Sequence, residues 1–255
     1  MLLTRIGNKQ SLSSEIYRYF PPHRMRITLF FGAGGIFFNT PLAEHNICND
    51  LDDDVTNLYL VVLHQREALK QQILRMPISA SLVRHWKSHW EVDPVLKAVR
   101  FLLLSNFTIY GKGHTLKLEV NRTKENLLRA IEPTFRKIQH CMFVNEDFRD
   151  VIGKVSFSKK KLTRDEAFLY LDPCYLDREH SYKVPKWKKD DTVDCLDIMA
   201  NEGIPAAMSE FDHPFVLKEA KRRHFHILPI KRRTNLKRKD NEILITNYWP
   251  QGLLF

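Results

Sequence analysis

Apolar residues along the chain fall into short runs that alternate with stretches of helical spacing. Residues 25–38 read as a buried strand, a glycine turn and the start of a helix. Further strands are expected at 47–49, 167–171, 203–208, 224–229 and 243–247, with a helix over 192–201. Strands that alternate with helices predict an α/β sheet.

The middle of the chain has a different pattern. Apolar residues recur at helical spacing over 55–73, 79–104 and 126–139, with an interruption near Pro94. Residues 105–120 carry β-branched and aromatic residues on both sides of Gly111 and Gly113, which predicts a β-hairpin. We therefore expect a catalytic domain made of residues 1–54 and 141–255, with a mostly helical insertion over 55–140.

Three of the nine glycines, Gly32, Gly34 and Gly35, fall within four residues. A glycine turn after a strand lets a ligand approach the backbone at the carboxyl end of an α/β sheet. Asp50 follows the next expected strand, where an acid typically binds ribose hydroxyls. A purely structural turn is the alternative interpretation of this pattern.

A formal net charge of +10 favours an anionic partner such as nucleic acid or a membrane surface, and the excess is concentrated in residues 183–189 and 218–239. No apolar stretch approaches the roughly 18 residues of a membrane span, so we expect a cytoplasmic protein. The four cysteines form no C-x-x-C pair. His85 and His89 have no third ligand nearby, so we expect no metal.

The segment FLYLDPCY, residues 168–175, delivers Asp172, Pro173 and Tyr175 to the end of a hydrophobic strand. It resembles the D-P-P-Y motif of amino-group DNA methyltransferases. An aromatic amine is a poor nucleophile, because its lone pair is delocalised into the ring. Two hydrogen-bond acceptors on the amine favour the geometry in which that lone pair faces a methyl donor.

Six segments in order extend the resemblance over nearly the whole chain: GNK at 7–9, FFGAGG at 30–35, NDLDDD at 49–54, NEDF at 145–148, DPCY at 172–175 and EILITNY at 242–248. Together they resemble the Dam-like family of adenine-N(6) DNA methyltransferases. This resemblance implies a Rossmann-like class I methyltransferase sheet with an inserted target-recognition domain, and S-adenosylmethionine as the methyl donor.

The resemblance also implies roles for individual residues. Asp50 would bind the donor's ribose and Asp147 its adenine amine. Asp172 and the Pro173 carbonyl would bind the target amine of a flipped adenine, and Tyr175 would stack on that base. The remaining residues implied in donor binding are Gly7, Lys9, Phe31, Gly32, Gly34 and Phe148.

The expected hairpin carries residues that suit contact with DNA. Asn106 and Lys112 can address bases, whereas Lys117 and Arg122 can address phosphates, and Tyr110 lies among them. An ordinary solvated hairpin is the alternative.

The sequence therefore predicts a monomeric DNA adenine methyltransferase that acts on duplex DNA. Two departures from the family pattern are Cys174 in place of the second proline and Thr28-Leu29 in place of Glu-Pro. They leave an inactive DNA-binding relative as one alternative. Enzymes that methylate the cytosine amine or RNA can share the Asp-Pro-x-Tyr pattern, so these substrates are another alternative. A restriction-modification system, a phage origin and a role in gene regulation are all compatible with such a sequence.

Overall fold

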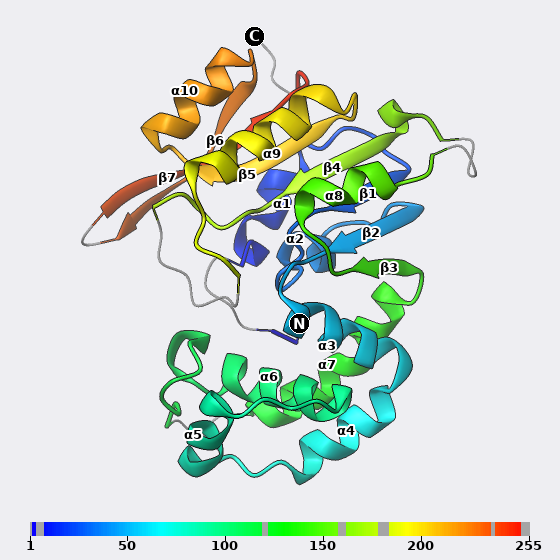
Figure 1. Cartoon of the computed structure of the whole chain (residues 1–255), viewed down its shortest axis with the longest axis vertical. Helices are drawn as coiled ribbons and strands as arrows, with labels where there is room; N and C mark the ends of the chain where they lie inside the picture. The colour runs from blue at the N-terminus through cyan, green and yellow to red at the C-terminus, as the bar shows by residue number, and fades with distance from the viewer. Residues whose placement is uncertain are drawn as a thin grey trace.

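The computed structural model describes residues 2–3, 8–118, 122–157, 162–177, 184–235 and 238–250, with the side chains of 231–240 left out. Seven strands form one sheet in the order β3-β2-β1-β4-β5-β7-β6 (Figure 1). The first five are parallel, whereas β7 runs antiparallel to both β5 and β6. The strands are β1 Met25–Thr28, β2 His45–Asn49, β3 Cys141–Val144, β4 Ala167–Leu171, β5 Ala206–Phe211, β6 His226–Asn235 and β7 Arg238–Thr246.

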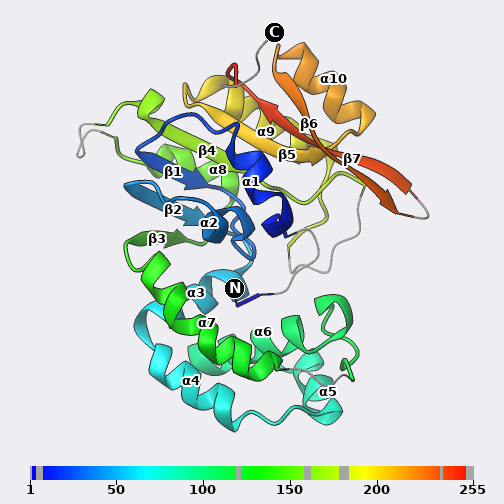
Figure 2. The same ribbon diagram turned by 180° about the vertical axis from the view of Figure 1, so that it is seen from behind.

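Both faces of the central strands β1 and β4 are buried, because helices cover each face of the sheet. Along β4, Phe168 and Tyr170 pack with Leu12 and Ile16 on one face, and the alternate residues Ala167, Leu169 and Leu171 pack on the other face. Figures 1 and 2 show α8 and α9 on one side of the sheet, and α1 and α2 on the other. These helices and the neighbouring α10 are α1 Ser13–Tyr17, α2 Gly35–Asn39, α8 Phe148–Val151, α9 Lys189–Asn201 and α10 Pro214–Arg222. The predicted Rossmann-like α/β fold is confirmed.

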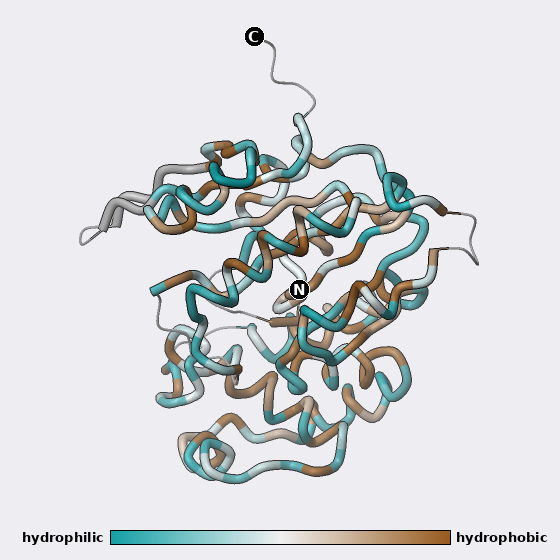
Figure 3. The backbone as a smooth tube through the Cα atoms, turned by 45° about the horizontal axis from the view of Figure 1, so that its top comes forward, coloured by the Kyte–Doolittle hydropathy of each residue, from teal (hydrophilic) through white to brown (hydrophobic). Residues whose placement is uncertain are grey.

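A lobe of five helices lies beyond the β3 edge of the sheet (Figures 1 and 2). Hydrophobic and hydrophilic residues alternate along these helices (Figure 3), and their apolar residues form a cluster that reaches Phe37 and Cys48 of the sheet layer. Pro94 occupies the first turn of α6, where Asp93 accepts a hydrogen bond from the Leu96 N–H. The helices are α3 Asp53–His64, α4 Arg66–Arg75, α5 Ala80–Ser88, α6 Pro94–Asn106 and α7 Thr123–Ile138.

The β-hairpin expected over residues 105–120 does not form as two strands in the described part of this segment. One antiparallel bridge joins Thr108 to Leu116, around a 3-10 turn at Ile109–Gly111. Tyr110, Gly111 and Gly113 all have positive φ, which curls the chain too tightly for a regular ladder. The Thr108 hydroxyl also donates to the Leu104 carbonyl and accepts from the Gly113 N–H, and these bonds compete with strand pairing.

Four of the described strands and α-helices, β3, α1, α8 and α10, were not expected from the sequence. β3 pairs with β2 and forms the edge of the sheet, and α10 packs beside α9. No helix in the described part of the chain has the length and apolarity that crossing a membrane requires.

Candidate active site

The carboxyl ends of four parallel strands bring the predicted site residues to one edge of the sheet. The glycine turn follows β1, and Asp50 comes directly after β2. Asp147 lies three residues beyond β3, and Asp172 follows β4. Ligands of open α/β sheets bind at this edge.

The glycine turn and Asp50 are joined directly. The Gly32 N–H donates to Asp50 Oδ2 at 2.6 Å, and the Asp52 N–H donates to Asp50 Oδ1 at 2.9 Å. Gly32 and Gly34 have φ of +52° and +68°, which glycine adopts without strain. A Cβ on Gly32 would meet no atom within 4 Å, so the backbone of the turn is open at this point.

The N-terminal segment at residues 8–10 packs against Gly35, the first residue of α2. A Cβ on Gly35 would lie 2.1 Å from Asn8 Oδ1 and 2.8 Å from the backbone nitrogen of Lys9. This close approach carries Lys9 past the glycine turn toward β4. Gly7, which the sequence places in the same motif, lies outside the described residues.

Lys9 ends in a cluster of acidic and phenolic side chains. Its Nζ lies 3.0 Å from Asp172 Oδ1 and 3.2 Å from Glu242 Oε1, and it is 4.5 Å from the centre of the Tyr175 ring. The Tyr175 hydroxyl donates to Glu242 Oε1 at 2.5 Å and also lies 3.3 Å from Asp172 Oδ1. The glycine turn and Tyr175 are therefore linked on the same side of the molecule through Gly35 and Lys9.

Burial and charge act against each other in this cluster. Burial acts to lower the pKa of Lys9, but Asp172 and Glu242 outweigh it and the pKa lies above its ordinary value. Burial raises the pKa of Asp172, which Lys9 opposes. Burial and the two carboxylates raise the pKa of Tyr175 well above its ordinary value, so its hydroxyl stays protonated and can donate.

Two acids of this edge were missed by sequence reasoning. Glu210, on β5, is 1% exposed, and burial raises its pKa to about 8. Glu242, on β7, is also 1% exposed and pairs with Phe211 across the sheet. Among the described residues, neither Glu210 Oε2 nor Glu242 Oε2 has a hydrogen-bond partner. The sequence signal for Glu242 was its place at the head of the EILITNY segment.

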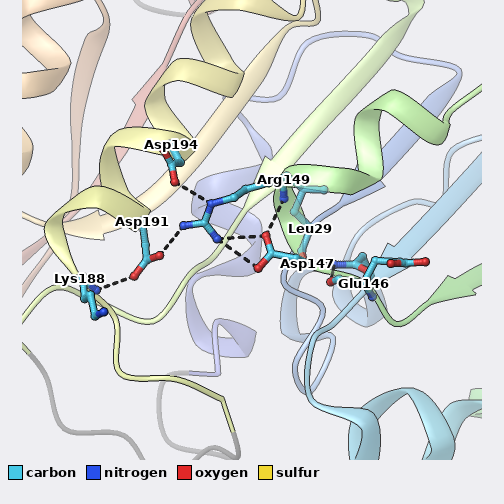
Figure 4. A network of polar contacts seen from close by, with 8 residues as sticks. Leu29, Glu146, Asp147, Arg149, Lys188, Asp191 and Asp194 are labelled. Carbon is cyan, nitrogen blue, oxygen red and sulfur yellow. Dashed lines mark hydrogen bonds and ion pairs between the residues drawn. The ribbon is translucent and has the colours of Figure 1, made fainter.

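Asp147 has both of its carboxylate oxygens engaged by Arg149 (Figure 4). It caps α8 by accepting from the Arg149 N–H at 3.0 Å, and the Arg149 guanidinium lies 3.1 Å from each oxygen. The same guanidinium binds Asp191 at 2.5 Å and Asp194 at 2.7 Å, which ties α8 to α9. A ligand that binds the Asp147 carboxylate must share it with Arg149.

Three other predicted site residues are buried. Phe148 is 5% exposed and packs against Phe30 and Trp187. Phe31 is 4% exposed, packs against aromatic rings that include Tyr59, and lies with its ring tip against Gly34. Pro173 is buried as well.

The residues expected to contact DNA lie on the helical lobe, apart from the acidic cluster. Tyr110 is 73% exposed, and Lys112, Lys117 and Arg122 are exposed as well. The Asn106 amide instead donates to the carbonyls of Leu2 and Leu102 inside the lobe. Two basic segments were expected at 183–189 and 218–239. Many of their lysines and arginines, namely Lys183 and those within 231–239, have side chains outside the described part of the structure.

No group of three or more potential metal-ligating side chains occurs within the described residues. His85 and His89 stack on each other with ring centres 4.2 Å apart.

Residues 6–241 match a family model described as D12 class N6 adenine-specific DNA methyltransferase. The matched span includes the glycine turn, Asp50, Asp147 and the DPCY segment, and it ends one residue before Glu242. Among individually curated proteins, none matches the chain.

Proposed function

Because the chain belongs to the D12 class of N6 adenine-specific DNA methyltransferases, we propose that it transfers a methyl group from S-adenosylmethionine to the amine of an adenine flipped out of duplex DNA. One observation carries this proposal: the glycine turn bound to Asp50 and the DPCY segment meet at the same sheet edge, joined through Lys9. A methyl donor and an amine acceptor can therefore lie side by side.

The residues around Gly32 fit a nucleoside-containing donor. The open backbone at Gly32 allows close approach, and two N–H groups fix the Asp50 carboxylate in the orientation needed to accept from ribose hydroxyls. Asp147 would accept from the donor's adenine amine. When bound, the donor supplies an electrophilic methyl group on a sulfonium.

The acceptor side consists of Asp172, Pro173 and Tyr175. Asp172 and the Pro173 carbonyl would each accept one amine hydrogen, which turns the nitrogen lone pair toward the methyl group. The C–S bond breaks as the N–C bond forms, which releases S-adenosylhomocysteine as a neutral thioether, and the methylated amine then loses one proton through the Asp172 carboxylate to water. The amine cannot reach a donor from inside a stacked duplex, so the base must leave the helix and stack on Tyr175.

We also propose that residues 55–140 recognise the target sequence, while 1–54 and 141–255 carry out catalysis in a monomer. The exposed group around Tyr110, with Lys112, Lys117 and Arg122, would contact DNA. The Asn106 amide already bonds inside the lobe, so its base contact would require those bonds to open.

The test is methyl incorporation into unmethylated duplex DNA, followed by nucleoside analysis of the product. N6-methyladenine is expected from the natural protein and not from Asp172→Ala. Methylcytosine, a product in RNA alone or no product would each contradict the proposal. Sequencing of modified bases in DNA from cells that express the protein would then give the recognised site.

A further inference from the structure

Glu242 is a buried acid that lies beyond the residues matched by the family model. It stands on β7, opposite Phe211 at the end of β5, so the antiparallel strand brings it to the edge where the parallel strands end. A buried carboxylate is strongly unfavourable unless cations or hydrogen-bond donors compensate it. The identity of those donors indicates what this residue does.

One oxygen of the Glu242 carboxylate interacts with two donors, the Tyr175 hydroxyl and the Lys9 ammonium. Oε1 accepts from the Tyr175 hydroxyl at 2.5 Å and pairs with Lys9 Nζ at 3.2 Å. These two groups come from the N-terminal segment and from the DPCY loop. Glu242 thus joins two segments that lie more than 160 residues apart in the sequence.

The same two donors also meet on a single oxygen of Asp172. Lys9 Nζ lies 3.0 Å and the Tyr175 hydroxyl 3.3 Å from Oδ1, whereas no described residue bonds to Oδ2. Asp172 is 22% exposed, in contrast to the buried Glu242. The carboxylate is therefore held by one oxygen and presents the other.

We propose that Glu242 is a positioning residue for methyl transfer: it holds Lys9 and Tyr175 on Asp172 Oδ1, so that Asp172 Oδ2 is directed at the target amine. This inference rests on the proposed function, because it takes Asp172 as the amine acceptor. Glu242 itself touches neither substrate.

The charges support this arrangement. The titratable groups that face Asp172 are Lys9 from the N-terminal segment, Glu242 from β7, Glu210 from β5, and Tyr170 and Tyr175 from β4 and its loop. At neutral pH Glu210 is mostly protonated, and Lys9 is the cation that lies against both Asp172 and Glu242. Loss of Lys9 alone leaves two carboxylates facing each other, which raises the pH at which Asp172 ionises.

The first measurement compares Glu242→Leu, Glu242→Gln and the control Glu219→Gln. Glu219 is also a buried acid, but it lies on α10 and binds Arg223, away from the site. We expect Glu242→Leu to lower kcat about 100-fold, with the dissociation constant of S-adenosylmethionine within about twofold of the natural value. Glu242→Gln should recover part of kcat, because its amide oxygen can still accept from Tyr175, and Glu219→Gln should keep kcat. Unchanged kcat in Glu242→Leu would overturn the proposal.

The second measurement is the pH dependence of kcat. If Glu242 only stabilised the fold, its substitution would leave this pH profile unchanged. Lys9→Met should shift the acidic limb to higher pH, and Lys9→Met/Glu242→Gln should shift it back, because one ionised carboxylate then remains. An identical limb in the single and double variants would overturn the proposal, even if Glu242→Leu failed to fold. If the natural protein methylates no adenine, the proposed function fails instead, so the two failures are distinguishable.

Discussion

Gly35 and Asn8 approach each other so closely that a Cβ on Gly35 would lie 2.1 Å from the Asn8 side-chain oxygen. A Gly35→Ala substitution must therefore push the N-terminal segment, and Lys9 with it, away from the sheet edge. We expect a loss of activity of about tenfold or more, because a displacement near 1 Å is costly in catalysis. Gly153→Ala is the matched control, since a Cβ there meets no atom within 4 Å; equal kcat/KM in both variants would refute this account of Gly35.

Asp172→Ala should abolish methyl transfer and leave donor binding nearly intact. Its carboxylate contacts Lys9 and Tyr175 on the acceptor side and makes no bond to the glycine turn. The expected loss in kcat is about 100- to 1,000-fold. Single-turnover methylation and calorimetry with S-adenosylmethionine check the two halves of this prediction, and undiminished turnover would remove Asp172 from the mechanism.

Asp50→Ala should weaken S-adenosylmethionine binding by about 1 to 3 kcal/mol. The substitution removes the proposed acceptor for ribose hydroxyls and also releases the Gly32 N–H that Asp50 binds. Isothermal calorimetry measures the change. Asp53→Ala is a nearby control, because that acid is exposed and pairs with Lys97; an equal effect of both substitutions would contradict the assignment.

Glu210 should make the protein less stable as pH rises. Its folded pKa of about 8 lies above its ordinary value of 4.5, so between these values the unfolded chain releases a proton that the folded protein retains. The free energy of unfolding should fall by about 1.4 kcal/mol per pH unit in this window. Glu210→Gln removes the titration and can still accept the Phe211 N–H. Urea denaturation of both proteins from pH 5 to 8 tests this, and parallel stability curves would rule it out.

Lys117→Ala should weaken DNA binding similarly for all sequences and reduce the salt dependence. Lys117 is exposed on the helical lobe, where a phosphate contact would release about one counterion. The slope of log K against log salt should decrease in magnitude by about one. Arg24→Gln serves as the control. Arg24 directly precedes β1, at the amino end of that strand, and pairs with Glu44 and Glu166. An unchanged slope in Lys117→Ala would place this residue outside the interface.

The central strands could be predicted from the sequence because their buried runs are strongly apolar. β4 reads AFLYL, and all five of its residues are buried. The edge strand β3 was missed because its residues are only partly buried and follow directly on the last turn of α7, where periodicity gives no boundary. The hairpin in the insertion was overestimated, because the sequence does not show that Thr108 bonds to Leu104 and Gly113.

The sequence could place the glycine turn, Asp50 and Asp172 at the site, because each follows a recognisable buried strand. It could not show that Asp147 shares its carboxylate with Arg149, since that contact depends on how α8 begins. Glu210 and Glu242 were missed for a related reason. Glu210 is brought to the site by the pairing of β5 with β4, and Glu242 by the register of β7 against β5, and no local pattern specifies either.

The order of the strands also constrains when the cluster can assemble during synthesis. β7 is the last strand to be made, yet it lies between β5 and β6, and β6 has no pairing with β5 of its own. Until β7 is inserted, Lys9, Asp172 and Tyr175 lack their shared carboxylate. A nascent chain that ends before residue 238 therefore lacks this carboxylate, even with the glycine turn, Asp50 and the DPCY segment already translated.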